Sequence, residues 1–251
     1  MPKTVLITGA TAGFGKAMAQ RYANEGWNLI LTGRRAERLE ELKTGLAPAK
    51  VHTLCFDVRD RQACQQAVDS LPAEFKGIDV LVNNAGLALG LEPAQSCDLD
   101  DWDAMVDTNI KGLMYMTRAV LPSMVERNKG HIVNLGSVAG TYPYPGGNCY
   151  GGTKAYVNHF SKNLLADLLG TKVRVTNIEP GLCETEFSVV RFKGDKKAAD
   201  KVYEGTQPIT PEDIAEIVYW TTTLPPHVNI NALEVMPVQQ AFSPFAISRD
   251  K

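Results

Sequence analysis

The stretch from residue 4 to residue 24 constrains the fold more than any other part of the sequence. Residues 4–8 form a short, continuous apolar run, which is typical of a strand buried on both faces. The turn TGATAGFG follows at once, and a helical pattern occupies residues 16–24. Glycines let a backbone approach a pyrophosphate, and a helix N-terminus offers unpaired N–H groups. A glycine-rich loop alone could be only a tight turn, but this order predicts a phosphate site lined by Gly9, Thr11, Gly13, Phe14 and Gly15.

Further apolar runs alternate with helical patterns along the rest of the chain. Strands are expected at residues 28–32, 51–56, 78–82, 131–135, 172–178 and 232–236. Strands that alternate with helices imply a parallel sheet with right-handed crossovers and helices on both faces. We find no internal repeat or linker, so we expect one α/β domain over residues 1–251, with a Rossmann-type doubly wound sheet.

The second expected strand ends in the sequence GRR. An acidic residue at this place in such a fold holds a ribose 2′-hydroxyl, whereas an arginine accommodates a 2′-phosphate. This chain has Gly33 where the acid would fall, followed by Arg34 and Arg35. The pattern therefore favours NADP over NAD. The alternative, that the arginines only begin a solvated helix, applies more to Arg35 than to Arg34.

Two later strand ends carry residues that suit a flat ligand. Asp57 is placed to accept from an adenine amino group, although it could equally be a structural cap. The NNAG sequence after the fourth strand supplies small and amide residues that let the backbone pass close to a ligand. Ligands of open α/β sheets collect at the carboxyl ends of the strands. We therefore expect contacts from Asp57, Val58, Asn83, Ala85 and Gly86.

Tyr150 and Lys154 form a YxxxK pair near the start of an expected helix. One helical turn separates them, so an ammonium lies beside a phenol. A positive charge about 4 Å away is worth up to ~4 kcal/mol, or roughly 3 pKa units, in a partly shielded site. Tyr150 could then exchange a proton near neutral pH, and the Ser137 hydroxyl could orient a substrate carbonyl. For an isolated match, a packed tyrosine and a solvated lysine would be the better interpretation.

Charge and cysteine content exclude several other classes of function. The 26 basic and 28 acidic residues give a net charge of -2, which argues against a nucleic-acid partner. The five cysteines are scattered and the four histidines lack metal-ligand spacing, so we expect a reduced protein without a metal. We see no signal-peptide core and no apolar run long enough for a bilayer, so we expect a soluble, cytoplasmic protein without a membrane partner.

Residues 101–126 read as one long helix with an apolar stripe too wide for a single sheet-facing side. Part of the stripe should pack on another subunit, and Phe242 and Phe245 in the tail could do the same. Pro122 should kink or end this helix. Asn109 lies in its middle, where its amide is either exposed or must find partners.

The segment 182–210 shows little periodicity and many charges, directly after the Pro180–Gly181 turn. A long irregular segment in a compact domain is usually a functional lid or disordered. We expect it to be a substrate lid.

Taken together, TGxxxGxG, NNAG, a mid-helix Asn, Ser137, YxxxK and the PG turn resemble the short-chain dehydrogenase/reductase family, from the first strand to the last. The resemblance implies a catalytic tetrad of Asn109, Ser137, Tyr150 and Lys154. Tyr150 would be the acid/base, and Ser137 would hold the alcohol or polarise the carbonyl. Lys154 would bind the nicotinamide ribose and lower the Tyr150 pKa, and Asn109 would fix a water linked to Lys154.

The resemblance also implies an NADP(H) site that extends to Pro180, Gly181 and Thr185, with Thr185 on the nicotinamide carboxamide. Phe14 stands where family members usually carry an aliphatic residue, a change that we expect to alter packing rather than activity. The broad apolar helices resemble the pair through which this family forms four-helix interfaces, so we expect a homotetramer.

Within the family, GRRAERLEEL, NNAGLALG and PGLCETEFSVVRFKGD are similar to the branch of NADP-dependent 3-hydroxy acid dehydrogenases. This branch oxidises serine and L-allo-threonine and reduces malonic semialdehyde. By this resemblance we expect oxidation of small 3-hydroxy acids, including the 3-hydroxypropionate type, and reduction of the matching semialdehydes or 3-oxo acids. Arg191 would bind the substrate carboxylate, unless it is only a surface residue, and Gly146 and Gly147 would leave room for a small molecule.

Two other functions stay open at this point. A short-chain carbonyl reductase for other ketones, sugars or sterols would share everything except the substrate lid. A non-catalytic, nucleotide-sensing Rossmann protein would commonly lack part of the Ser, Tyr and Lys set, which is complete here.

Overall fold

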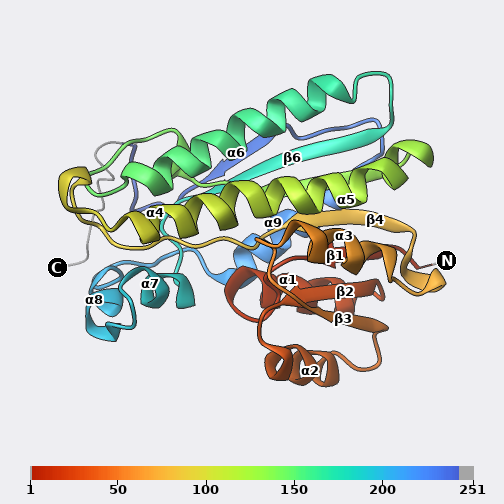
Figure 1. Ribbon diagram of the computed structural model, residues 1–251, viewed down its shortest axis with the longest axis horizontal. Helices are drawn as coiled ribbons and strands as arrows, with labels where there is room; N and C mark the ends of the chain where they lie inside the picture. Colours follow the sequence, from red (N-terminus) through yellow and green to blue (C-terminus); the bar gives the residue numbers. More distant parts are fainter. Residues whose placement is uncertain (1, 243–251) are drawn as a thin grey trace.

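Seven parallel strands form one sheet between two layers of helices in the computed structural model, which describes residues 2–242 (Figure 1). The order across the sheet is β3-β2-β1-β4-β5-β6-β7. The strands are β1 (Thr4–Ile7), β2 (Asn28–Gly33), β3 (Val51–Cys55), β4 (Ile78–Asn83), β5 (Gly130–Leu135), β6 (Val173–Pro180) and β7 (Ala232–Val235). The expected doubly wound parallel sheet is confirmed.

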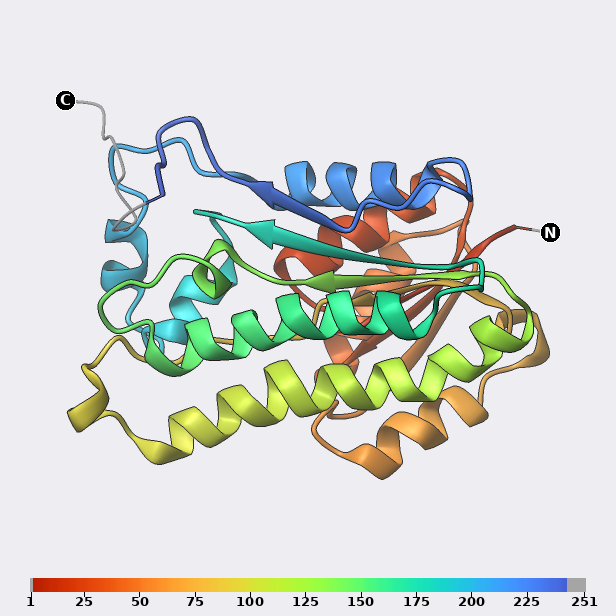
Figure 2. The same ribbon diagram turned by 90° about the horizontal axis from the view of Figure 1, so that it is seen from above.

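The helices that connect the strands divide between the two faces of the sheet. They are α1 (Gly13–Asn24), α2 (Ala36–Gly45), α3 (Arg61–Asp69), α4 (Leu99–Val106), α5 (Leu113–Glu126), α6 (Asn148–Asp167), α7 (Glu186–Arg191), α8 (Lys196–Lys201) and α9 (Pro211–Thr223). Figure 2 shows α1 and α9 on one side of the sheet and α3, α5 and α6 on the other.

The strand order reverses direction between β1 and β4. From β1 the chain adds β2 and β3 on one side, and then returns to add β4 to β7 on the other. Such a switch point opens a crevice at the carboxyl ends of the strands. The arrowheads in Figure 2 point toward the end of the molecule where α7 and α8 lie.

Both faces of the central strands are buried, which explains their continuous apolar runs. In β1, Val5 and Ile7 belong to the core that includes α1, α2 and α9, whereas Leu6 belongs to the core that includes α3, α5 and α6. All three side chains are fully buried. Alternate residues of a strand point to opposite faces, so a two-sided core needs an apolar residue at each position.

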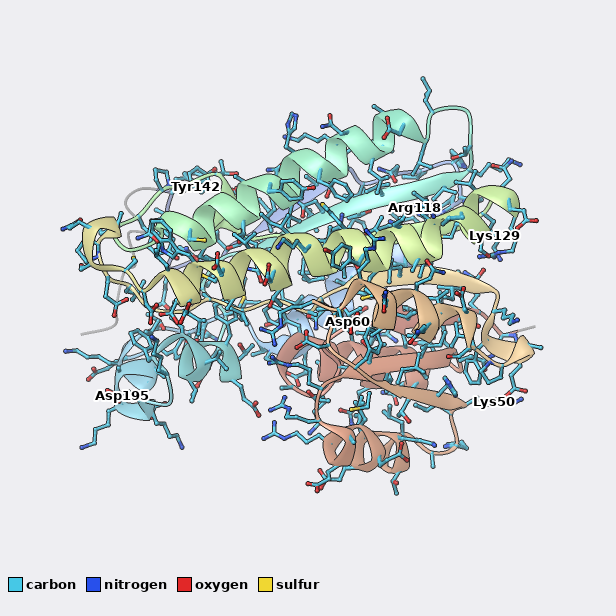
Figure 3. All side chains as sticks on the ribbon, viewed as in Figure 1. Lys50, Asp60, Arg118, Lys129, Tyr142 and Asp195 are labelled. Atoms are coloured by element: carbon cyan, nitrogen blue, oxygen red, sulfur yellow. The ribbon has the colours of Figure 1, made fainter. Side chains whose placement is uncertain are left out.

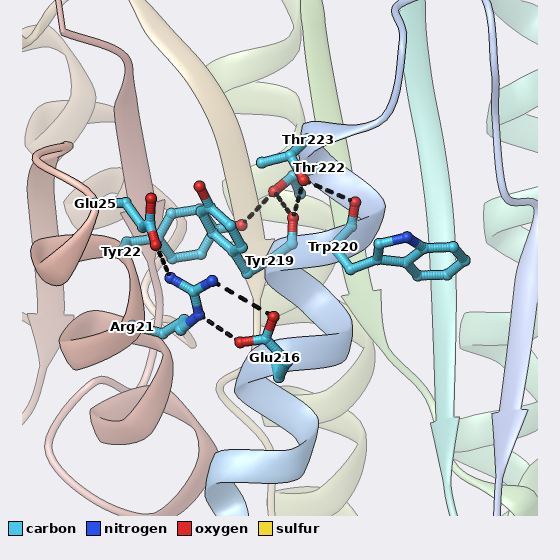
Figure 4. A network of polar contacts seen from close by, with 8 residues as sticks. All are labelled: Arg21, Tyr22, Glu25, Glu216, Tyr219, Trp220, Thr222 and Thr223. Carbon is cyan, nitrogen blue, oxygen red and sulfur yellow. Dashed lines mark hydrogen bonds and ion pairs between the residues drawn. The ribbon is translucent and has the colours of Figure 1, made fainter.

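A polar network at the edge of the first core joins α1 to α9 (Figure 4). Arg21 pairs with Glu216 and lies 3.8 Å from the ring centroid of Tyr219. The buried Tyr22 hydroxyl shares a 2.7 Å hydrogen bond with the Thr222 hydroxyl. These contacts fix the C-terminal helix against the helix of the glycine-rich turn.

The long helix expected over residues 101–126 begins earlier and contains a change of winding. α4 begins at Leu99, a π-helical segment covers Asp107–Gly112, and α5 runs on to Glu126. Pro122 does not end the helix, so that alternative is wrong. The loss of its N–H is tolerated because Val120 and Met124 on either side are buried in the core.

The segment 182–210 is more regular than its sequence indicates. It contains the short helices α7 and α8, whose first turns are capped by the side chains of Thr185 and Asp195. Figure 3 shows Asp195 at the end of the molecule opposite Lys50, which precedes β3. Helices shorter than two turns carry too few residues to display periodicity, which explains why the pattern predicted irregular chain.

Phe242 is exposed and lies 5.2 Å, between ring centroids, from Tyr142. Phe245, which was expected to join it in a contact with a neighbouring subunit, lies outside the described residues. Contact between subunits therefore stays a prediction.

Candidate active site

A cavity of about 360 Å³ opens at the carboxyl ends of the strands, at the switch point between β1 and β4. Its wall contains most of the site residues expected from the sequence, which come from positions far apart along the chain. They are Gly9, Thr11, Gly13, Phe14, Arg34, Arg35, Asp57, Val58, Ala85, Gly86, Ser137, Tyr150, Lys154, Pro180, Gly181 and Thr185. The expected residues outside this wall are Gly15, Asn83, Asn109, Gly146, Gly147 and Arg191.

The glycine-rich turn leaves an anion cradle at the start of α1. Gly9 and Gly13 have φ angles of +65° and +48°, a region that glycine adopts without strain. No side chain caps the N-terminus of α1 within the described residues, so its first N–H groups are available to an anion. Gly15 serves packing instead, because a Cβ there would lie 2.3 Å from the Gly9 carbonyl oxygen.

The two asparagines of NNAG point to different places. Asn83 turns into the core, where its amide donates to Thr117 and Asn134, each at 2.9 Å. Asn84 lines the cavity, and its Nδ2 donates to the carbonyl oxygens of Thr8 and Gly9 at 2.8 and 3.1 Å. The expectation for Asn83 was therefore one residue off. The alternation of side chains at the end of a strand could have indicated Asn84.

Arg34 and Arg35 stand at the rim of the cavity, beyond β2. The Arg35 guanidinium donates to the Thr11 hydroxyl at 2.7 Å, while Arg34 lies 3.8 Å from an Asp57 carboxylate oxygen. Burial raises the pKa of Asp57, but hydrogen bonds from Arg59 outweigh that effect and lower the pKa overall. The rim thus combines a stable carboxylate with exposed guanidinium groups.

An acid of α7 faces these arginines across the cavity. Glu186 lies 3.1 Å from Arg38 and 3.7 Å from Arg35, between guanidinium nitrogens and its own carboxylate oxygen. Neither Glu186 nor Arg38 was expected in the site. Arg38 could have been found from its place in the first turn of α2, three residues after the N-cap Arg35.

Lys154 and Ser137 are held in place by the backbone beneath the cavity. Lys154 is buried, and its Nζ donates to the Leu135 carbonyl oxygen at 2.7 Å. Burial lowers the pKa of Lys154 to about 8. The Ser137 hydroxyl donates to the Pro180 carbonyl oxygen at 3.4 Å and accepts from the Ala139 N–H at 3.1 Å.

Tyr150 gives up its proton less readily in this setting than its neighbour Lys154 predicts. Burial raises the pKa of Tyr150 to about 12, although the Arg191 charge and a hydrogen bond with Ser137 act in the opposite direction. The Lys154 Nζ lies 5.8 Å from the Tyr150 ring centroid. The expected fall of the Tyr150 pKa is therefore wrong when only the protein's own groups act on it. Burial raises this pKa by more than the nearby positive charge and hydrogen bond lower it.

Asn109 lies in the π-helical segment and is 2% exposed, so the exposed alternative is wrong. Its Oδ1 accepts from the Leu87 N–H at 2.9 Å, and its Nδ2 donates to the Leu87 carbonyl oxygen and the Thr153 hydroxyl at 2.8 and 3.0 Å. π-Helical turns often mark functional sites, and this one turns Asn109 toward the loop that follows β4. Helical periodicity could not predict it.

The glycines expected to make room for a substrate are in contact with protein atoms. A Cβ on Gly146 would lie 2.3 Å from the Leu91 carbonyl oxygen, and one on Gly147 would lie 2.5 Å from the Tyr144 ring. The expectation that both glycines leave room for a small molecule is wrong, because the chain itself fills that space. Their role is to bring Tyr144 and Leu91 close to the start of α6.

Arg191, at the end of α7, reaches back to the first turn of α6. Its guanidinium lies 5.0 Å from the Tyr150 ring centroid, and its Nη2 donates to the Tyr144 hydroxyl at 2.6 Å. Its Nε is buried and has no hydrogen-bond partner among the residues described. Arg191 is therefore only partly exposed, and an unsatisfied buried donor beside Tyr150 suits an anionic ligand.

Residues 2–242 contain neither a metal site nor a membrane-spanning helix. No group of three or more His, Cys, Asp or Glu side chains there is arranged to hold a metal. None of the helices in this part of the chain is long and apolar enough to cross a bilayer.

Comparisons with known proteins agree with this geometry. Residues 3–196 match the family model described as short chain dehydrogenase. The NADP-dependent 3-hydroxy acid dehydrogenase YdfG of Salmonella typhi is 60% identical over 246 residues, which cover 98% of this chain and 99% of that protein. Sulfoacetaldehyde reductase 2 of Chromohalobacter salexigens is 56% identical over 252 residues, with both chains covered fully. The closed form of serine dehydrogenase complexed with NADP+ superposes with a TM-score of 0.93 at 58% identity, covering 98% of this chain and 100% of that one.

Proposed function

The chain belongs to the short-chain dehydrogenase family of oxidoreductases, and on that basis we propose that it oxidises small 3-hydroxy acids with NADP+ and reduces the matching semialdehydes or 3-oxo acids. Serine, L-allo-threonine and 3-hydroxypropionate are the type of substrate we have in mind. The observation that carries the proposal is Arg191, whose buried, unpartnered Nε lies beside Tyr150. A guanidinium there fits the carboxylate of a hydroxy acid.

The cavity fits NADP(H). The backbone of the glycine-rich turn packs closely against the loop after β4, since a Cβ on Gly9 would lie only 3.0 Å from the Ala85 Cα. The turn and the N-terminus of α1 would hold the pyrophosphate, and Arg34 and Arg35 the 2′-phosphate. Further contacts would come from Asp57 and Val58 at the adenine, from Asn84, Ala85 and Gly86 along the wall, and from Pro180, Gly181 and Thr185 at the nicotinamide. When bound, NADP+ supplies the acceptor for a hydride.

Each polar residue of the cavity has a separate role in the proposed reaction. Ser137 holds the substrate hydroxyl, and Tyr150 removes its proton as hydride leaves the carbinol carbon. Lys154 binds the nicotinamide ribose from its position on the Leu135 carbonyl. With serine, the oxidised product carries a carbonyl β to the carboxylate and can lose CO2. In the reductive direction Tyr150 returns the proton to the carbonyl oxygen.

We retain for Asn109 the role of fixing a water linked to Lys154. Its Oδ1 and the Lys154 Nζ lie 3.3 and 3.6 Å from one point, the position that a Cβ on Gly86 would occupy. A small residue at Gly86 keeps this space open for a bridging water.

A second candidate reaction is the reduction of sulfoacetaldehyde. The 56% identity to a sulfoacetaldehyde reductase over the full length of both chains favours it. A sulfonate presents the same negative charge and acceptor oxygens to Arg191 as a carboxylate does, so the same cavity could take both.

The segment 182–210 acts as the substrate lid of a single domain, residues 1–251, in this proposal. It contributes Cys183, Thr185, Glu186, Phe187 and Val190 to the cavity wall. Opening and closing of this segment would admit the substrate and exclude water.

The protein acts as a cytoplasmic homotetramer in this proposal. Apolar side chains of α4, α5 and α6 that lie outside the two buried cores remain partly or largely exposed, and they include Trp102, Met114, Val125 and Tyr156. A second copy would cover them.

Initial rates with NADP+ and NAD+ test the proposed function. The substrates are L-serine, both threonine diastereomers, 3-hydroxypropionate and the matched neutral alcohol propan-1-ol. NADP-dependent oxidation of the acids that exceeds that of propan-1-ol is expected, and Arg191→Ala should raise KM for the acids. Reduction of unrelated ketones without oxidation of any acid would favour a carbonyl reductase. NADP binding without turnover of any compound would favour a nucleotide sensor.

A further inference from the structure

Two cations approach Tyr150 from different elements. The Arg191 guanidinium lies 5.0 Å from the Tyr150 ring centroid, and the Lys154 Nζ lies 5.8 Å from it. Lys154 is part of α6, the same helix as Tyr150, and is anchored to the Leu135 carbonyl. Arg191 belongs to α7, in the segment 182–210. The charge it brings therefore depends on where that segment lies.

Several contacts hold the Arg191 guanidinium over Tyr150. The Tyr144 hydroxyl accepts from its Nη2 at 2.6 Å, and the Phe187 ring lies 5.6 Å from it. The Arg191 carbonyl oxygen accepts from the Gly90 N–H at 3.0 Å, which ties the end of α7 to the loop after β4. The Tyr144 and Phe187 contacts position the guanidinium itself, and the Gly90 contact fixes the backbone that carries it.

The two cations differ in how firmly they keep their charge. Burial lowers the pKa of Lys154 to about 8, whereas an arginine stays charged throughout the working range of pH. Besides these cations, Tyr150 faces the Ser137 hydroxyl, the Tyr144 phenol and the Cys183 thiol. Tyr144 and Cys183 carry no charge until they ionise, so Arg191 is the permanent charge of this environment.

We propose that Arg191 has a second role, as a cation supplied by the 182–210 segment that favours the ionised form of Tyr150 and couples substrate charge to the proton transfer. The inference rests on the proposed function of Tyr150 as the acid/base. When the segment lies over the cavity, the Arg191 charge raises the fraction of Tyr150 that is ionised and can accept the proton of the alcohol. This effect is therefore confined to the state in which the substrate is enclosed. An anionic group bound to Arg191 offsets its charge and favours protonated Tyr150, the form needed to reduce a carbonyl.

The pH dependence of kcat/KM for a neutral alcohol isolates this electrostatic role, because such a substrate makes no ion pair with Arg191. The measurement is made at saturating NADP+, whose nicotinamide ring would add a positive charge near Tyr150 and lower its pKa below the value of about 12 that burial sets. Propan-1-ol oxidation by wild type should then rise with pH toward a plateau as Tyr150 ionises. In Arg191→Met the inflection should move up by about one to two pH units, the effect of removing a charge some 6 Å away. Below both inflections, kcat/KM should fall roughly ten- to a hundredfold.

Two further variants separate charge from packing. Arg191→Lys keeps the charge and should bring the inflection back most of the way to wild type. Lys193→Met removes a cation from the same segment, one that pairs with Asp101 and is not among the described groups that act on Tyr150. Its inflection should stay at the wild-type value.

The hydroxy acid itself provides a second readout. With saturating 3-hydroxypropionate, the bound carboxylate offsets the Arg191 charge, so the wild-type inflection in kcat should lie above the wild-type inflection with saturating propan-1-ol. If the two wild-type inflections are equal, the proposed coupling to substrate charge is wrong.

The outcomes distinguish this inference from the proposed function. An unchanged inflection in Arg191→Met with propan-1-ol, together with a raised KM for hydroxy acids, would overturn the second role and leave the substrate assignment intact. A shifted inflection with propan-1-ol in an enzyme that oxidises no hydroxy acid would support the second role of Arg191 and overturn the substrate assignment. An equal shift in Arg191→Met and Arg191→Lys would assign the effect to packing and overturn the inference.

Discussion

If the arginines of the rim hold the 2′-phosphate as proposed, Glu186 competes with it for Arg35, and Glu186→Gln should tighten NADPH binding. In the structure its carboxylate lies 3.1 Å from Arg38 and 3.7 Å from Arg35. A phosphate that binds Arg35 must compete with this carboxylate or repel it. Replacing the acid with an amide of the same shape removes that competition while leaving the guanidinium groups in place.

The exposure of the groups limits the size of the effect. The Glu186 side chain is 56% exposed and those of Arg35 and Arg38 are each 45% exposed. Exposed pairs are worth roughly 0.2–1 kcal/mol each, so the two together contribute about 1 kcal/mol. The dissociation constant of NADPH should therefore fall about fivefold, and that of NADH should change little.

Fluorescence titration of NADPH and NADH at low and high salt measures both constants. Glu184→Gln is the matched control, because Glu184 is exposed and makes no ion pair within the described residues. The gain in Glu186→Gln should shrink at high salt, since salt screens exposed charges. Weaker NADPH binding, or an equal change for NADH, would refute the competition and indicate that Glu186 supports the cofactor.

Three further predictions follow from the buried groups of the site. Tyr150→Phe should abolish turnover but retain NADPH binding in the same titration, and substantial residual activity would remove Tyr150 from the acid/base role. Asn109→Leu should lower the free energy of unfolding by about 2–5 kcal/mol in a denaturant titration, because it leaves the Leu87 peptide and the Thr153 hydroxyl without their partner; a loss below 1 kcal/mol would contradict this. The pKa of Lys154 falls on folding from 10.5 to about 8, so the unfolded chain binds more protons between these values and the Lys154 contribution to stability rises with pH. Lys154→Met should therefore stabilise more at pH 7 than at pH 10, by a difference on the order of 3 kcal/mol, and an equal effect at both pH values would count against it.

The order of strands and helices could be predicted from the sequence because each buried strand reads as an apolar run. Val5, Leu6 and Ile7 each face a core, so the pattern leaves little choice of structure. The glycine-rich turn and the YxxxK pair could also be predicted from the sequence, because the positions of their residues depend on neighbours in the chain. These are features set by neighbours in the chain.

Features set by distant contacts could not be predicted in the same way. The π-helical segment that turns Asn109 inward has no periodic signature, and the pKa of Tyr150 depends on burial by segments far along the chain. The contact of Arg191 with Tyr150 was missed although Arg191 was expected in the substrate site. The contact of Glu186 with Arg38 was not predicted, because an acid within a charged segment has the sequence pattern of a solvated residue. Only the fold shows that the two side chains meet.

Transfer of deuterium from substrate to cofactor tests the account most directly. The substrate is 3-hydroxypropionate with deuterium on the carbinol carbon, and the reduced cofactor is analysed by mass spectrometry. The proposed chemistry predicts one deuterium in the NADPH formed by wild type and no reduced cofactor with Tyr150→Phe. NADPH without deuterium, or no oxidation of the acid at all, would contradict hydride transfer from the carbinol carbon of a 3-hydroxy acid.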